Sequence, residues 1–240
     1  MKLGLQLNRF DWTGGPERYG ATLTEIARTA EDAGFDRIAV ADHVWQHPTM
    51  GGPEANEPEC YTTLAFLAAY TERVGLGAMV SGVHFRYPAV LVKAVTTLDV
   101  LSGGRAWLGI GSGHYGEETR GLGIPFPEQR VRFEMLEEAI QIALRMWSGE
   151  HGDERPFEGK HYHLERPLNL PQSLTRPHPP IMIAGDGERR RSGSSPATPT
   201  PVACARARRS RGNSTYCAGT ARKRGENMGR SRRPAPSPST

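Results

Sequence analysis

The 240-residue chain has few cysteines and no long apolar segment. It contains three cysteines without a CxxC pair, which excludes a disulfide-stabilised scaffold and leaves no zinc motif. No run of 18 or more apolar residues occurs, so we predict no membrane-spanning segment. The first residues also lack the basic region and apolar core of a secretory signal. We therefore expect a cytoplasmic protein with no membrane partner.

Acidic and large apolar residues are nearly absent from the last fifty positions. Residues 191–240 contain eleven lysines and arginines but a single acid, Glu226. They contain no Leu, Ile, Phe or Trp, and Val202 is their one valine. So little apolar surface cannot offset the entropy lost when a chain becomes ordered. We predict a folded domain over residues 1–190 and a disordered, basic, low-complexity tail over 191–240.

The basic tail has three interpretations: a solvated extension, a nucleic-acid-binding arm, or the product of a shifted reading frame. Base stacking has little support because Tyr216 is the tail's one aromatic residue, so we expect no nucleic-acid partner. Permitted GC-rich codons for residues 190–202, read two nucleotides later, encode TLRLVARYADAC. The same shift over residues 212–229 permits ELDVLRGHCEEAGREYG. Both strings are typical of amphipathic helices, which favours a frameshift near Arg190.

Strands and helices alternate along the first 190 residues. We predict strands at 3–7, 35–41, 74–80, 106–110 and 180–184, and helices at 22–33, 63–72, 88–101 and 128–147. An irregular stretch over 149–180 contains a short strand at 160–164. This alternation predicts parallel βα units. No GxGxxG follows the first strand, so we favour a βα-barrel over a doubly wound sheet.

Four stretches of this α/β pattern resemble the luciferase-like superfamily, in the class that uses the deazaflavin coenzyme F420. They are AEDAGFDRIAVADHVWQ (30–46), TERVGLGAMVSGVHFRYPAVLVKAVTTLDVLSGGRAWLGIGSG (71–113), LGIPFPEQRVRFEMLEEAIQIALRMWSG (122–149) and FEGKHYHLERPLNLPQSLTRPHPPIMIAGDGE (157–188). The resemblance implies an eightfold βα-barrel, the TIM barrel of the bacterial-luciferase type. About five of its strands are present before the predicted frameshift.

The resemblance also implies a function. It indicates an F420-dependent oxidoreductase that transfers a hydride between the coenzyme and a small organic substrate, in a protein that is usually a homodimer. One alternative is a monooxygenase that uses reduced FMN and oxygen on the same barrel. Another is an inactive truncated fragment, because a barrel without about three of its strands is not closed.

Three residues that follow the second strand are the candidate catalytic groups. His43 titrates near neutrality and is suited to proton transfer, although a histidine at a strand end also serves for packing alone. Asp42 would either bind a ring nitrogen of the coenzyme or set the tautomer of His43. Trp45 would form a wall of the pocket, or belong to the core.

The remaining candidate residues bind the cofactor in the family, and they also follow strands. Relatives carry a bulge with a non-prolyl cis peptide against the ring at the position of Met79, Val80 and Ser81. A loop at the ring edge and ribityl chain corresponds to Gly111, Ser112, Gly113 and His114. A glycine-rich phosphate turn corresponds to Gly185, Asp186 and Gly187, where the Asp186 carboxylate would repel phosphate. We expect no metal, because a solvated edge explains His161 and His163 better than a metal site.

Overall fold

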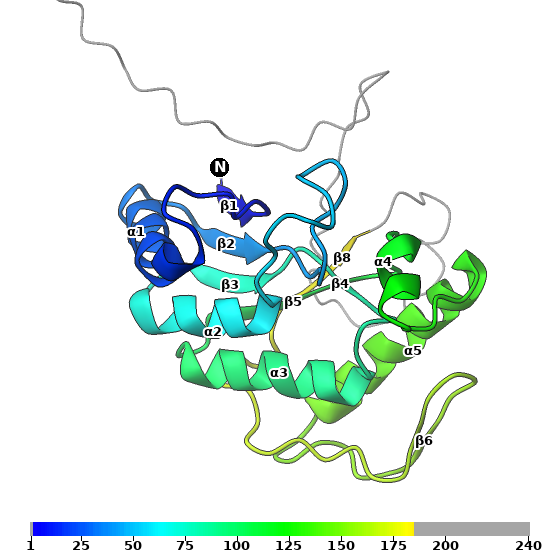
Figure 1. Cartoon of the computed structure of the whole chain (residues 1–240). Coiled ribbons are helices and arrows are strands. Elements are labelled where there is room, and N and C mark those ends of the chain that lie inside the picture. Colours follow the sequence, from blue (N-terminus) through cyan, green and yellow to red (C-terminus); the bar gives the residue numbers. More distant parts are fainter. Residues whose placement is uncertain (1, 185–240) are drawn as a thin grey trace, which may run out of the picture. The chain divides into compact units, whose positions relative to one another are not determined.

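The computed structural model of the chain describes residues 2–184. The predicted phosphate turn at Gly185–Gly187 and the basic tail over 191–240 lie outside the described residues. Figure 1 shows an arc of parallel strands with helices packed along its outer side. None of the helices within residues 2–184 has both the length and the apolar character needed to cross a bilayer.

The main sheet contains parallel strands joined by helical crossovers. Its order is β1 (Gly4–Leu7), β2 (Arg37–Val40), β3 (Gly75–Ala78), β5 (Ala106–Gly111), with β4 (Ser81–Gly82) and β8 (Ile181–Ala184) also paired to β5. Both β3 and β4 pair with β5, so they are two parts of one barrel strand. The non-prolyl cis peptide Met79–Val80 separates them, at the predicted position. The five predicted strand positions are therefore confirmed.

Four long helices cover the outer face of the strands (Figure 1). They are α1 (Tyr19–Asp32), α2 (Cys60–Tyr70), α3 (Pro88–Leu101) and α5 (Gln129–Met146). Neighbouring helices contact one another in the order α1, α2, α3, α5. Because the helices and strands advance around the arc in the same order, the described part is a segment of a βα-barrel.

Side chains of successive strand residues point to opposite faces of the sheet, and both faces carry an apolar layer. Outward residues such as Ile38, Leu76 and Leu108, all at most 1% exposed, join the core between strands and helices. Inward residues form a smaller cluster of Ala39, Trp107 and Met182, with Val80 packed against it. A Cβ on Gly77 would lie 2.5 Å from the Trp107 indole, so glycine at this position leaves room for the large inward side chain.

Several element boundaries differ from the sequence prediction. The helix predicted at 63–72 begins at Cys60, because the Glu59 carboxylate caps it by accepting the Tyr61 and Thr62 backbone N–H groups. It ends at Tyr70, because Thr71 is extended and its carbonyl accepts a hydrogen bond from Arg105.

Other elements start earlier or were not predicted. Helix α1 begins at Tyr19 rather than residue 22, directly after a 3₁₀ turn, η1 (Pro16–Arg18). The short strand predicted at 160–164 is β7 (His163–Leu164), which pairs with the unpredicted β6 (Phe157–Glu158). The six-residue helix α4 (Gly116–Gly121) was also missed, and it carries an important residue of the candidate site.

Candidate active site

The predicted site residues meet at one edge of the sheet. Asp42 and His43 follow β2, while Ser81 lies opposite Ile110 and Gly82 lies opposite Gly111 in the parallel register. Gly111 is also paired with Ala184, the last residue of β8. Because all of these strands are parallel, their carboxyl ends share one rim, where βα-barrels place their ligands.

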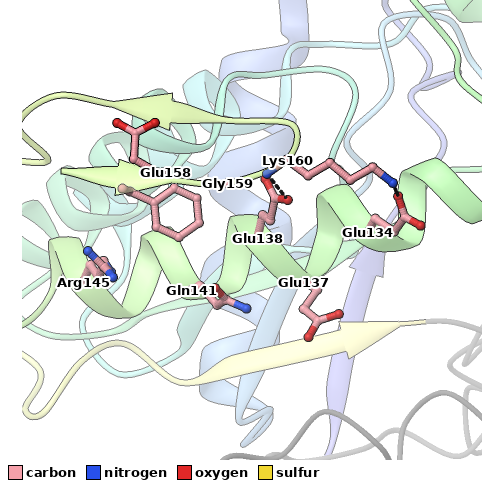
Figure 2. Close-up of a pocket in the computed structure, with 9 residues that line it drawn as sticks. Glu134, Glu137, Glu138, Gln141, Arg145, Glu158, Gly159 and Lys160 are labelled. Carbon is pink, nitrogen blue, oxygen red and sulfur yellow. Dashed lines mark hydrogen bonds and ion pairs between the residues drawn. The ribbon is translucent and has the colours of Figure 1, made fainter.

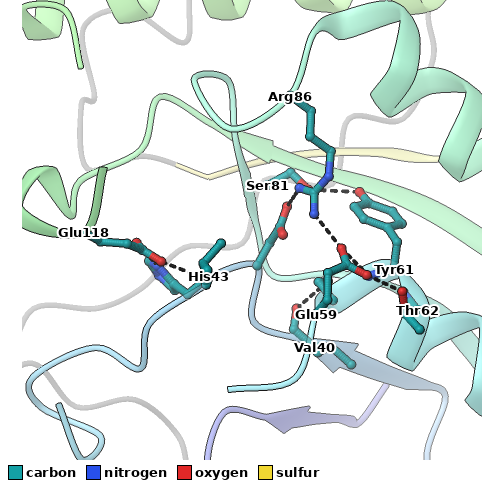
Figure 3. Close-up of polar contacts among 11 residues, drawn as sticks. Val40, His43, Glu59, Tyr61, Thr62, Ser81, Arg86 and Glu118 are labelled. Atoms are coloured by element: carbon teal, nitrogen blue, oxygen red, sulfur yellow. Dashed lines mark hydrogen bonds and ion pairs between the residues drawn. The ribbon is translucent and has the colours of Figure 1, made fainter. Parts of the chain in front are cut away.

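A buried carboxylate of α4 holds His43. The His43 Nδ1 and Glu118 Oε2 atoms are 2.8 Å apart, and Figure 3 shows the two side chains pointing toward one another. The Glu118 side chain is fully buried, whereas that of His43 is 17% exposed. Glu118 Oε1 accepts two further hydrogen bonds, from the backbone N–H groups of Val44 at 2.5 Å and Trp45 at 2.9 Å. The carboxylate thus fixes both the imidazole and the backbone that follows it.

This contact shifts the pKa of both groups. Burial alone would lower the pKa of His43, but the hydrogen bond and charge of Glu118 outweigh it and raise the pKa. Burial would raise the pKa of Glu118, but the hydrogen bonds from His43, Trp45 and Val44 lower it. An ionised Glu118 accepts a hydrogen bond from Nδ1–H, so Nε2 is the His43 nitrogen that gains and loses a proton.

Aromatic rings surround His43 at the rim. Its ring centroid lies 5.5 Å from that of His114, 6.0 Å from that of Tyr115 and 6.3 Å from that of His47. His47 and His114 are themselves 5.3 Å apart. Burial and the charge of His43 lower the pKa of His47. The rings therefore form a cluster in which a positive charge on His43 disfavours protonation of the neighbouring His47 imidazole.

Trp45 lies beside α4 at the same rim. It is partly buried, and a Cβ on Gly121 would overlap its indole. The Trp45 backbone N–H donates to Glu118, so one carboxylate positions both Trp45 and the His43 imidazole. This position is compatible with the predicted pocket wall.

Asp42 contacts Arg86 rather than His43. Arg86 Nη1 donates to Asp42 Oδ2 at 2.5 Å. Its Nη2 donates to Glu59 Oε1 at 2.6 Å, and Figure 3 shows the Arg86 and Glu59 side chains joined by this bond. Asp42 is buried, at 4% exposed. The interpretation that Asp42 sets the His43 tautomer is wrong, because Glu118 occupies Nδ1. The other interpretation, a contact with the coenzyme ring, stays a prediction.

The interrupted strand presents the Met79–Ser81 segment to the rim. Met79 is 36% exposed, Val80 packs on the inward cluster, and Ser81 is buried. The Ser81 hydroxyl lies 2.9 Å from the Tyr61 hydroxyl. The guanidinium of Arg86 lies 4.9 Å from the centre of the Tyr61 ring, so this segment and Asp42 belong to one polar network.

A buried arginine supports the loop from Gly111 to His114. Arg132 Nε donates to the Ser112 carbonyl at 2.9 Å, and Nη2 donates to the Gly113 carbonyl at 3.4 Å. Gly113 has a φ of 77°, which other residues rarely adopt. His114 is exposed at the end of this loop. Arg132 therefore fixes the backbone of this loop at the rim.

Residues 2–184 contain no group of three or more His, Cys, Asp or Glu side chains placed to bind a metal ion. His161 Nε2 contacts Glu134 and His163 Nδ1 contacts Glu158, each at 3.0 Å. Figure 2 shows the surface pocket beside α5 and the β6–β7 hairpin. Glu138, which lines this pocket, accepts hydrogen bonds from the backbone N–H groups of Lys160, His161 and Tyr162, so its carboxylate anchors the hairpin.

Sequence reasoning missed three charged residues of the rim. Glu118 and Arg86 hold the two predicted residues His43 and Asp42. Burial raises the pKa of Glu57 to about 7, with smaller effects from Gln46, His43, Glu118 and Asp42. The sequence offered one indication for Arg86 and Glu118, because each lies a few residues after a predicted strand, where the site residues of βα-barrels are found.

The profile of the luciferase-like monooxygenase family matches residues 5–192. The chain belongs to this family. It is 39% identical over 145 residues to the F420-dependent glucose-6-phosphate dehydrogenase of Kineococcus radiotolerans, covering 59% of this chain and 40% of that protein. It is 35% identical over 162 residues to the Nakamurella multipartita protein of the same name, covering 66% and 45%. The chain thus spans less than half the length of these curated relatives.

A solved structure gives the same fold. The luciferase-like chain superposes on the monooxygenase RslO1 from Streptomyces bottropensis with a TM-score of 0.65 at 26% identity, covering 78% of this chain and 54% of that one. The arc of strands described above is therefore part of a luciferase-like TIM barrel.

Replacing Glu118 with Gln is expected to invert the tautomer of His43 and to lower its pKa. The backbone N–H groups of Val44 and Trp45 need the amide oxygen, so the amide NH₂ faces Nδ1 and moves the ring proton to Nε2. The raised pKa of His43 stabilises the native state fully below pH 6.5, and this contribution is lost as pH rises through the folded-state pKa. The variant should lose about 1.5–3 kcal/mol below pH 6.5 and less at higher pH.

Urea denaturation at several pH values and ¹⁵N spectra of the imidazoles measure these effects. Glu117→Gln is the matched control, because Glu117 is the exposed neighbour on α4. An unchanged His43 tautomer in Glu118→Gln would contradict the assignment.

Proposed function

We propose that this chain carries the catalytic rim of an F420-dependent oxidoreductase that acts on a small hydroxyl- or carbonyl-bearing substrate. The observation that carries the proposal is the His43–Glu118 pair, a buried carboxylate that fixes the tautomer of a partly exposed imidazole. Both curated relatives are named as F420-dependent enzymes, which favours this coenzyme over FMN.

The residues of the rim fit such a ligand. Several buried polar atoms have no hydrogen-bond partner within the described part of the chain, among them Tyr115 Oη, Trp107 Nε1 and both ring nitrogens of His84. Leaving such groups unpaired costs stability, so they call for a polar partner. A deazaflavin has ring carbonyls and a hydroxylated side chain that would supply one. Asp42, Ser81 and the Gly111–His114 loop would line its binding place.

Bound F420 supplies the acceptor or donor for the hydride. The protein moves the accompanying proton. When an alcohol is oxidised, His43 Nε2 takes the hydroxyl proton as the hydride leaves carbon, and in the reverse direction it returns that proton to the carbonyl oxygen. Glu118 keeps the imidazole oriented in both protonation states and stabilises the imidazolium. The surrounding rings of His47, His114 and Tyr115 limit the access of water to the imidazole.

The chain is expected to bind F420 at least about tenfold more tightly than FMN, because both curated relatives are named as F420-dependent enzymes. Fluorescence titration of the 240-residue chain with each coenzyme measures the two dissociation constants. Reduction of bound F420 by a panel of alcohols, with glucose 6-phosphate among them, then tests the substrate class. Tighter binding of FMN, together with oxygen-dependent turnover, would favour the monooxygenase alternative.

We further propose that residues 191–240 arise from a shifted reading frame. The family match ends at residue 192, next to the change in composition at Arg191, and this supports the proposal. The coding DNA tests it, because codons incompatible with the two helix-like strings would exclude the shift. The alternative of an inactive truncated fragment predicts that restoring the frame, but not the present chain, yields F420 binding.

A further inference from the structure

His84 occupies a socket made by two glycines at the rim. It follows β4, and a Cβ on Gly82 would lie 2.6 Å from His84 Cε1. A Cβ on Gly113 would overlap the same ring. The Phe85 and Phe126 ring centroids lie 4.2 Å and 5.0 Å from that of His84. The chain therefore makes room for this imidazole directly against the Gly111–His114 loop.

The polar atoms of His84 are anomalous for a residue that serves packing alone. Both Nδ1 and Nε2 are buried, and neither has a hydrogen-bond partner within residues 2–184. A neutral imidazole carries one N–H donor and one acceptor nitrogen, and both lose their water here. A phenyl ring would fill the same socket without this penalty. The imidazole is thus an unused donor and acceptor at the proposed ligand site.

The charges around His84 keep it neutral. Burial and the positive charge of Arg132 lower the pKa of His84 to about 4, with His43 and His114 adding to this effect and Glu118 opposing it. Arg132 is buried at 8% exposed and donates only to the carbonyls of Pro127, Ser112 and Gly113 among the described residues. No carboxylate in this part of the chain neutralises it, so a second cation beside it is disfavoured.

We propose that His84 is a ligand-binding residue whose neutral imidazole donates one hydrogen bond to a hydroxyl-bearing chain of the bound coenzyme and accepts another from it. A hydroxyl group is both donor and acceptor, so a hydroxylated chain satisfies both nitrogens. A phosphate or carboxylate only accepts and would leave one nitrogen unpaired. This inference rests on the proposed function, because F420 is the ligand that supplies the hydroxylated chain at the Gly111–His114 loop.

The first test uses the intact chain labelled with ¹⁵N-histidine. The spectrum of His84, assigned by its loss in His84→Phe, should show one protonated and one bare nitrogen between pH 5.5 and pH 8. Saturation with F420 should shift both ¹⁵N resonances. A ring that titrates within this range, or resonances that F420 leaves unchanged, would overturn the inference.

The second test compares two variants that alter the same socket. His84→Phe keeps an aromatic ring and removes both polar atoms, so F420 should bind roughly tenfold more weakly while Tm stays equal or rises. Phe126→Leu alters packing on the same ring and should lower Tm without weakening F420 binding. Unchanged F420 affinity in His84→Phe would show that the bound coenzyme does not contact His84. If the unmodified chain binds no F420, the proposed function and this inference both fail, whereas binding without an effect of His84 overturns only the inference.

Discussion

A His43→Asn variant is expected to lose at least about 100-fold in the rate of F420 reduction, with little change in the dissociation constant for F420. Asn fills part of the imidazole volume and still bonds to Glu118, but it has no group that exchanges a proton near neutral pH. The loss should appear in kcat more than in KM, because proton transfer accompanies the hydride step rather than binding. Stopped-flow absorbance of F420 with the preferred alcohol measures the rate.

The matched control for this variant is His163→Asn. His163 lies on β7, its side chain is 64% exposed, and it pairs with Glu158 outside the rim. The same chemical change there should leave the rate within about twofold. Equal rates for wild type and His43→Asn would remove His43 from the proton-transfer step.

An Arg86→Met variant is expected to lose about 3–5 kcal/mol of unfolding free energy, because it leaves the buried Asp42 carboxylate without its partner. Glu59 also loses its contact with Arg86, but its side chain is 47% exposed and water replaces that bond. Urea denaturation measures the loss as a lower midpoint with an unchanged slope.

The double variant Asp42→Asn/Arg86→Met separates charge from packing. Once Asp42 is neutral, most of the lost stability should return, whereas F420 should bind more weakly than to the unmodified chain if Asp42 contacts the coenzyme ring. Arg166→Met is the control, because Arg166 pairs with Glu154 on the surface and should cost less than about 1 kcal/mol. Equal instability of the single and double variants would show that Arg86 acts through packing alone.

The alternation of strands and helices was predictable because the parallel strands are buried on both faces and have strong apolar patterns. Val74 to Val80 illustrates this, since the apolar run identified the strand and the resemblance identified the break at Met79–Val80. The ends of α2 were less predictable. They depend on the Glu59 cap and on the Arg105 bond to Thr71, and the second of these contacts joins residues distant in sequence.

The partners of the site residues could not be predicted for the same reason. His43 and Asp42 were identifiable from their position after a strand, but Glu118 lies 75 residues from His43 and Arg86 lies 44 residues from Asp42. Glu118 also belongs to a helix of sequence GEETRG, which has no apolar periodicity to predict it. His84 had no pattern at all, because its socket depends on Gly113 in another loop.

The imidazole at the end of β2 and the carboxylate that governs it belong to separate connections of the barrel. The segment after β2 therefore determines where the His43 imidazole lies, whereas α4 determines its pKa through Glu118. A displacement of α4 that moves Glu118 away from the imidazole would lower the pKa of His43. Substitutions at Gly116, the first residue of α4, thus offer a way to change the pKa of His43 through the position of Glu118.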